Sequence, residues 1–137
     1  MGKTKKEPRT KVMLVISEDR EAIIDIKQVF DICMPEFIIK IANTCEEIAK
    51  VISFSNLKFI LLDLNGETTD NFEILSAIKK KVNAPLITMS YSRDSSLLIK
   101  ALALEADNHI TKPFHQLELI AHVRACLRRS QRQFGKL

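Results

Sequence analysis

The chain has 137 residues, of which 46% are hydrophobic and 28% charged, a composition typical of one soluble globular domain. It contains no apolar run near the ~20 residues that a membrane-spanning helix needs, and no apolar segment that would make the N-terminus a signal peptide. The net charge of +4 comes from the ends, because residues 1–11 sum to +4 and residues 124–137 to +5, leaving −5 for residues 12–123. This acidic body argues against nucleic-acid binding by the domain itself.

The predicted elements alternate along the chain. Apolar runs bounded by polar residues predict strands at Lys11–Ile16, Phe37–Ala42, Lys58–Asp63, Pro85–Ser90 and His109–Thr111. Apolar residues at three- and four-residue spacing predict helices at Arg20–Cys33, Thr44–Phe54, Asp70–Lys81, Ser95–Ala106 and Gln116–Arg132. Five β–α units in series predict a doubly wound, parallel five-stranded sheet in a three-layer α/β/α arrangement.

The three cysteines are odd in number and widely spaced, and they form no metal-binding pattern with the histidines. We interpret them as reduced thiols, which is typical of a cytoplasmic protein. The chain also has only 3 glycines and no glycine-rich phosphate loop, which disfavours dinucleotide or nucleoside triphosphate binding.

Polar side chains stand where several predicted strands end. They are Glu18 and Asp19 after the first strand, Asp63 and then Asn65 at the third, Ser90 at the fourth and Lys112 after the fifth. The carboxyl ends of parallel strands meet at the ligand crevice of such sheets, so we expect these groups to lie together. Clustered carboxylates need a cation, and Mg²⁺ prefers oxygen ligands. An aspartate can accept a phosphoryl group, and a lysine can hold phosphate oxygens.

With these features the sequence resembles the receiver domain of response regulators, the CheY-like family of two-component signalling, from Lys11 to about Arg129. The motifs that carry the resemblance are Phe59–Leu64, Asp70–Leu75, Ala84–Ile87, Ala106–Phe114 and Glu118-Leu119. The resemblance implies the flavodoxin-like (βα)5 fold. It also implies a signalling domain that is not an enzyme acting on an external substrate.

By this resemblance Asp63 is the phosphoacceptor, which receives its phosphoryl group from a partner histidine kinase. Mg²⁺ is the implied cofactor, held by Glu18, Asp19, Asp63 and the backbone carbonyl of Asn65. The family's acidic pair follows its first strand, and two alignments remain open, Ser17-Glu18 and Glu18-Asp19. We favour the second, because the apolar positions of the next helix then face inward.

The resemblance assigns further roles near the phosphoacceptor. Ser90 is the implied switch hydroxyl and Lys112 the phosphate-contacting lysine, with a cis bond to Pro113. His109 stands where the family usually has a switch tyrosine or phenylalanine. Glu105 stands where a glycine is usual.

The ending Val123–Arg129 looks like the receivers of winged-helix transcription factors. We therefore expect a flexible basic extension over residues 1–10 and a receiver domain over residues 11–130. Residues 131–137 are then a tail or the start of a linker to an absent output domain. DNA would be bound only by that output domain, and we expect no membrane partner. The phosphorylated receiver would form a homodimer through its fourth helix, fifth strand and fifth helix.

Two rival interpretations remain. A pseudo-receiver would use the same fold as a protein-interaction module that is never phosphorylated, and the ambiguous acidic pair is its best support. A flavodoxin-like enzyme or cofactor binder is the weaker rival, because a phosphate-cradling loop is missing after the first strand.

Overall fold

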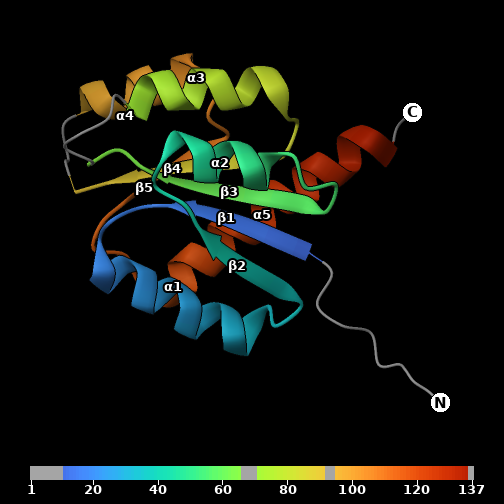
Figure 1. Ribbon diagram of the computed structural model, residues 1–137. Helices are drawn as coiled ribbons and strands as arrows, with labels where there is room; N and C mark the ends of the chain where they lie inside the picture. Colours follow the sequence, from blue (N-terminus) through green and yellow to red (C-terminus); the bar gives the residue numbers. More distant parts are fainter. Residues whose placement is uncertain (1–10, 66–70, 92–94, 136–137) are drawn as a thin grey trace.

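A computed structural model describes residues 11–65, 71–91 and 95–135 of the chain (Figure 1). The strands are β1 (Lys11–Ile16), β2 (Phe37–Ile41), β3 (Leu57–Asp63), β4 (Leu86–Ser90) and β5 (Asn108–Thr111). The helices are α1 (Arg20–Cys33), α2 (Cys45–Ile52), α3 (Asn71–Lys81), α4 (Ser95–Ala103) and α5 (Gln116–Gly135). Strands and helices alternate strictly, as the apolar patterns predicted.

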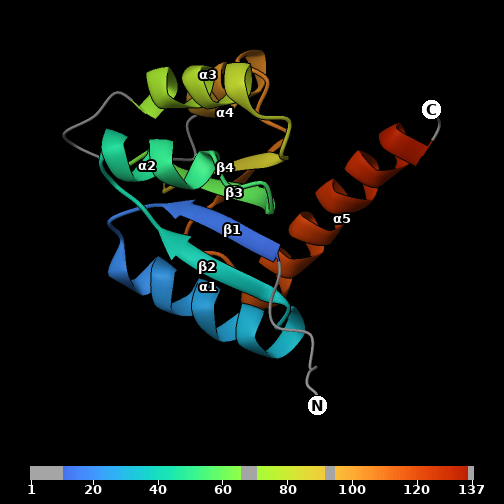
Figure 2. The same ribbon diagram turned by 45° about the vertical axis from the view of Figure 1, so that its right-hand side comes forward.

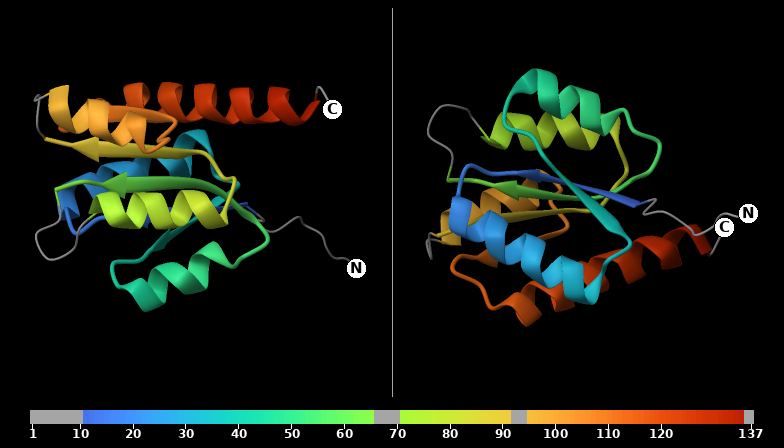
Figure 3. Two further views of the ribbon diagram at one scale, coloured as in Figure 1. Left: turned by 90° about the horizontal axis from the view of Figure 1, so that it is seen from above. Right: turned by 60° about the horizontal axis from the view of Figure 1, so that its bottom comes forward.

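The strands form one parallel sheet in the order β2-β1-β3-β4-β5. Helices α1 and α5 cover one face, and α2, α3 and α4 cover the other (Figures 1 and 3). This confirms the predicted doubly wound, three-layer fold. The strand order reverses between β1 and β3, and open α/β sheets place their ligand crevice at such a switch point.

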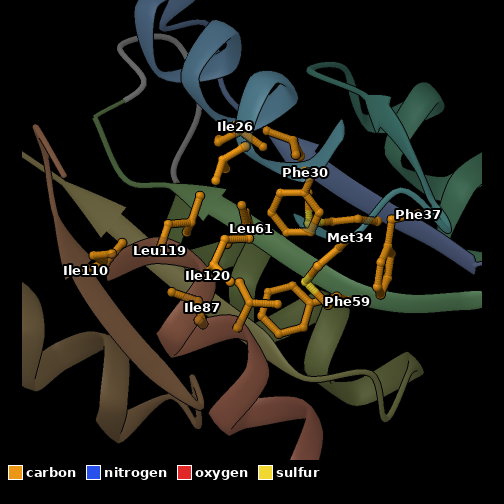
Figure 4. Packing of buried hydrophobic residues seen from close by; sticks show 14 of the residues in the cluster. Ile26, Phe30, Met34, Phe37, Phe59, Leu61, Ile87, Ile110, Leu119 and Ile120 are labelled. Atoms are coloured by element: carbon orange, nitrogen blue, oxygen red, sulfur yellow. The ribbon is translucent and has the colours of Figure 1, made fainter. Parts of the chain in front are cut away.

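Two hydrophobic cores pack against the sheet, one on each face, because successive side chains of a strand point to opposite sides. Along β3, Phe59 and Leu61 join the core under α1 and α5, whereas Ile60 and Leu62 join the core under α2, α3 and α4. The first of these cores is drawn in Figure 4. A strand buried on both faces is a continuous apolar run, which is why its pattern was readable.

The helix ends show how local chemistry sets the boundaries. Asp19 caps α1 by accepting the Ala22 amide, and Thr44 and Glu47 form the predicted capping box of α2. Helix α5 runs to Gly135, beyond its predicted end, and its last turns extend past the sheet (Figure 2). The predicted extension over residues 1–10, and residues 136–137 of the predicted tail, lie outside the described residues.

Helix α4 ends earlier than predicted, at Ala103 instead of Ala106. Glu105 has a φ of 75°, and the amides of Glu105 and Ala106 return to the carbonyls of Leu102 and Ala101. These bonds form a Schellman motif, which needs one left-handed residue, usually glycine. The sequence pattern missed this end because a glutamate occupies that position.

Helix α4 buries few of its described side chains. Of the α4 side chains that the structure describes, only Ala101 is buried, while Leu98, Ile99 and Leu102 are exposed. None of the helices in the described parts of the chain combines the length and apolar character needed to cross a membrane.

Candidate functional site

A cluster of buried charges lies at the carboxyl ends of the central strands. The Lys112 ammonium is 2.6 Å from Asp63 Oδ2 and 2.9 Å from Asp19 Oδ2. The side chains of Lys112, Asp63 and Asp19 are 2%, 5% and 17% exposed. One ammonium thus serves two carboxylates in a largely dry site, and removing it would leave both without their cation. The Lys112–Pro113 bond is cis, as the resemblance implied.

Ser17, which only the less favoured alignment placed at the site, is a member of this cluster. Its hydroxyl donates to Asp63 Oδ2 at 2.7 Å and accepts the Asp19 amide at 3.0 Å. Ser17 is buried, whereas Glu18 is exposed. Hereafter the charged cluster means Ser17, Asp19, Asp63 and Lys112.

The structure therefore brings neither candidate acidic pair into the site as a unit. Asp19 enters because it caps α1, while its neighbour Glu18 lies on the surface. The sequence did carry a signal for this arrangement, because aspartate is a preferred N-cap residue. Placing Asp19 at the start of α1 leaves Ser17 at the end of β1.

The polypeptide around Asp63 is fixed by two asparagines. The Asn65 amide donates to Asp63 Oδ1 at 3.0 Å, which places the Asn65 backbone beside the carboxylate. The Asn71 side chain donates to the Asp63 carbonyl, linking the end of β3 to the start of α3. These bonds orient the Asp63 side chain at the switch point of the sheet.

Tyr91 covers the charged cluster, and sequence reasoning did not single it out. Its hydroxyl donates to Asp19 Oδ2 at 2.8 Å, and its ring centroid lies 4.3 Å from the Lys112 ammonium. Its amide donates to Asn65 Oδ1 at 2.7 Å. The only sequence signal was position, since this single tyrosine of the chain directly follows Ser90.

These contacts change how two groups ionise. Burial alone would raise the pKa of Asp19, but hydrogen bonds from Lys112, Tyr91 and the Ala22 amide together lower it. The hydrogen bond to Asp19, aided by burial, raises the pKa of the Tyr91 phenol. Both shifts keep Asp19 anionic and Tyr91 neutral near pH ~7.

Ser90 and His109 lie together beside the cluster. His109 Nε2 is 3.1 Å from Ser90 Oγ, and Nδ1 is 2.7 Å from Thr88 Oγ1. Burial lowers the pKa of His109, which favours the neutral ring. Thr88 was also missed, although it lies two residues before Ser90 and so shares its face of β4. The histidine thus connects two hydroxyl groups of the neighbouring strand.

The donors of the charged cluster fit Mg²⁺, although fewer of them converge than predicted. Across the described residues, no three His, Cys, Asp or Glu side chains gather as a metal-binding group. The two carboxylates that do converge, those of Asp19 and Asp63, are hard oxygen ligands, and Mg²⁺ commonly takes only one or two carboxylates with phosphate and water.

The face formed by α4, β5 and α5 has a different chemistry. Asn108 Nδ2 lies 2.8 Å from His122 Nδ1, and Glu118 is 3.9 Å from His122 Nε2. Asp107 accepts the Leu86 amide at 2.7 Å and pairs with Lys79 at 3.2 Å. We call this surface, together with exposed Leu98, Ile99 and Leu102, the α4–β5–α5 face.

A comparison with protein families identifies the family of the chain. The profile of the response regulator receiver domain matches residues 13–124, and the chain belongs to that family. Cell cycle transcriptional regulator CtrA of Caulobacter vibrioides is 38% identical over 73 residues, 53% of this chain and 32% of that protein. Transcriptional regulatory protein YvrH of Bacillus subtilis is 31% identical over 118 residues, 85% of this chain and 49% of that protein. The chain spans half or less of these relatives.

Solved structures agree on the fold. A two-component response regulator from Clostridium difficile superposes with a TM-score of 0.77 at 24% identity, covering 88% of this chain and 98% of that one. A CheY-like receiver domain protein from Methanospirillum hungatei gives a TM-score of 0.77 at 19% identity, covering 90% and 98%. Both comparisons support the flavodoxin-like arrangement of the sheet.

Proposed function

We propose that this receiver domain accepts a phosphoryl group from a histidine kinase onto Asp63, with Mg²⁺ as cofactor. It acts as a cytoplasmic signalling domain and not as an enzyme on an external substrate. The observation that carries the proposal is the buried Lys112 ammonium 2.6 Å from the Asp63 carboxylate at the end of β3. Such an ammonium can hold phosphoryl oxygens at the acceptor.

The two oxygens of Asp63 are not equivalent. Oδ2 accepts short bonds from Ser17 and Lys112, whereas Oδ1 accepts the longer bond from the Asn65 amide. We assign Oδ1 as the nucleophile, because its lone pairs are less stabilised. It would attack the phosphorus of a phosphohistidine; the new O–P bond forms as the N–P bond breaks, and the imidazole leaves with the electron pair. Bound Mg²⁺, held by Asp19 and Asp63, would neutralise phosphoryl charge.

Phosphorylation would add about −1.5 to −2 charge beside Ser90. A phosphoryl oxygen can accept the Ser90 hydroxyl, which would break its contact with His109. The change would then reach the α4–β5–α5 face and favour a homodimer through it. By analogy with the transcriptional regulators it resembles, the domain would control a DNA-binding output domain.

A phosphotransfer experiment tests the proposal. The protein is incubated with acetyl phosphate, with and without Mg²⁺, and analysed by intact mass and peptide mapping. We expect one phosphoryl group on Asp63 only when Mg²⁺ is present. Asp63→Asn keeps the side-chain volume but removes the nucleophile, so it will gain none. An adduct retained in Asp63→Asn, or its absence from wild type, would reject the proposal.

A phosphorylation-independent interaction module is the second candidate. The observation that favours it is the exposure of Glu18, which leaves the site with fewer acids than the resemblance implied. Under this alternative, sedimentation would give the same association state with and without Mg²⁺ and acetyl phosphate.

A further inference from the structure

We propose that Tyr91 is a cover over the phosphoacceptor site, and that a divalent cation which binds Asp19 Oδ2 displaces the Tyr91 hydroxyl from that oxygen. The inference rests on the proposed function, since it concerns how that site is loaded. Tyr91 directly follows β4, and it contacts residues that follow the other three central strands: Asp19 after β1, Asn65 after β3 and Lys112 after β5.

The first step concerns the oxygen atoms of Asp19. Oδ2 accepts both the Lys112 ammonium at 2.9 Å and the Tyr91 hydroxyl at 2.8 Å. Oδ1 accepts the Ala22 amide at 3.2 Å. A carboxylate oxygen has about two lone-pair sites, so Oδ2 is fully used. A cation can reach this oxygen only by displacing one of its two donors.

The second step decides which donor leaves. Lys112 is 2% exposed and is also held by Asp63, so its release would strand two buried carboxylates. Tyr91 is 49% exposed, and its hydroxyl can bond to water once released. Tyr91 therefore leaves at the lower cost.

The third step concerns the ring. It lies over the Lys112 ammonium, and its electron-rich face is attracted to that charge. The ring thus shields the ammonium that would hold phosphoryl oxygens. Moving it would give the cation access to Asp19 and the phosphoryl group access to Lys112.

The chain provides its own probe of this movement. Tyr91 is its single tyrosine, and it has no tryptophan, so its ultraviolet emission reports Tyr91 alone. A carboxylate acceptor quenches an excited phenol, so release from Asp19 will increase the emission. We expect this increase, and greater quenching by acrylamide, to follow the calorimetric Mg²⁺ binding curve, and to grow further with beryllofluoride, a phosphoryl mimic.

Variants separate the hydroxyl from the ring. Tyr91→Phe removes the bond to Asp19 but keeps the ring, and we expect it to bind Mg²⁺ about tenfold more tightly, equivalent to ~1.4 kcal/mol. Tyr91→Ala removes both and will bind at least as tightly. Ile32→Ala is the matched control, because it also shortens an exposed apolar side chain, on the last turn of α1. Its affinity will equal that of wild type at equal ionic strength.

The outcomes are distinct from those of the phosphotransfer test. Unchanged tyrosine emission during Mg²⁺ binding, or equal affinities of wild type and Tyr91→Phe, would overturn the cover even if Asp63 is phosphorylated. Absence of Mg²⁺ binding in every variant would overturn it as well. Coupled emission and binding without a phosphoryl adduct would support the cover and reject phosphotransfer.

Discussion

The charged cluster and the α4–β5–α5 face contrast in how their polar groups are held. In the cluster, Lys112 is buried and each carboxylate depends on it. On the face, the Lys79–Asp107 pair is partly open to water, with side chains 15% and 38% exposed. A buried charge needs its partner, whereas an exposed one can be solvated instead. Changes of similar chemistry will therefore have unequal effects in the two regions.

The largest effect is expected for Lys112→Met. It leaves the Asp63 and Asp19 carboxylates together without a cation, and we expect a loss of about 3–5 kcal/mol in the free energy of unfolding. Urea denaturation at neutral pH measures it. Lys79→Met is the control in the other region, with an expected loss below about 1 kcal/mol. Equal losses for the two variants would remove the contrast.

The next effect concerns association through the α4–β5–α5 face. Ile99 is 63% exposed, and burying such a side chain contributes about 1.5–3 kcal/mol. We expect Ile99→Lys to weaken the dimer formed with a phosphoryl mimic by at least tenfold, equivalent to ~1.4 kcal/mol. Monomer stability will stay within about 0.5 kcal/mol of wild type. Sedimentation equilibrium gives the dimer constant, and an unaltered constant would place the interface elsewhere.

A smaller effect, this time a gain in stability, is expected for Glu105→Gly, which lies between α4 and β5. The left-handed conformation of Glu105 costs a non-glycine residue about 1–2 kcal/mol. Glycine removes that cost, but its greater unfolded-state entropy lowers the gain in stability by about 0.4–1 kcal/mol. We expect a net stabilisation of about 0.5–1 kcal/mol by urea denaturation. Ala103→Gly, at the last residue of α4, is the control and will destabilise by about 1 kcal/mol at most. A destabilised Glu105→Gly would contradict the Schellman ending.

The smallest effect is a pH dependence at His109, which lies between the two regions. Because burial lowers its pKa below the usual 6.5, protonation costs more in the folded than in the unfolded protein. The associated stability is present above pH ~6.5 and is lost as pH falls through the folded-state pKa. Asp19 contributes only near and below its usual 3.8. Wild type will therefore lose more stability than His109→Gln between pH ~7.5 and pH ~5.5, and parallel curves would refute the assignment.

Most of the fold could be predicted, because strands buried on both faces are unmistakable apolar runs. The carboxyl end of β3 followed from such a run, whereas α1 followed from apolar residues at helical spacing. The early end of α4 was not predicted from the sequence pattern, because a glutamate at 105 adopts a conformation that glycine favours. The only signal was the resemblance, in which a glycine is usual at this position.

The candidate site was predictable to the level of topology. Asp63, Asp19, Ser90 and Lys112 were expected at one edge because parallel strands share that edge, and the structure places them there. Their chemical roles stay predictions. Glu18 lies outside the charged cluster because Asp19, and not Glu18, is the N-cap of α1. Hydrophobic periodicity does not fix the start of a helix to within one residue.

Contacts between side chains distant in sequence were beyond prediction. Ser17 and Tyr91 reach the cluster through bonds that span 46 and 72 positions in the chain. Asn108 and His122, 14 positions apart, also pair, with His122 Nδ1 2.8 Å from Asn108 Nδ2. Asp107 accepts the Leu86 amide, 21 positions away, and pairs with Lys79.

The small number of buried side chains described for α4 has a consequence for local unfolding. A helix whose described side chains include a single buried residue, Ala101, has little to lose when it detaches. Its amide hydrogens will therefore exchange with solvent at a lower free energy than those of β1 or β3, whose apolar residues are buried on both faces. The element beside the proposed dimer contact thus contributes one buried side chain among those described, Ala101, to the core under α2, α3 and α4.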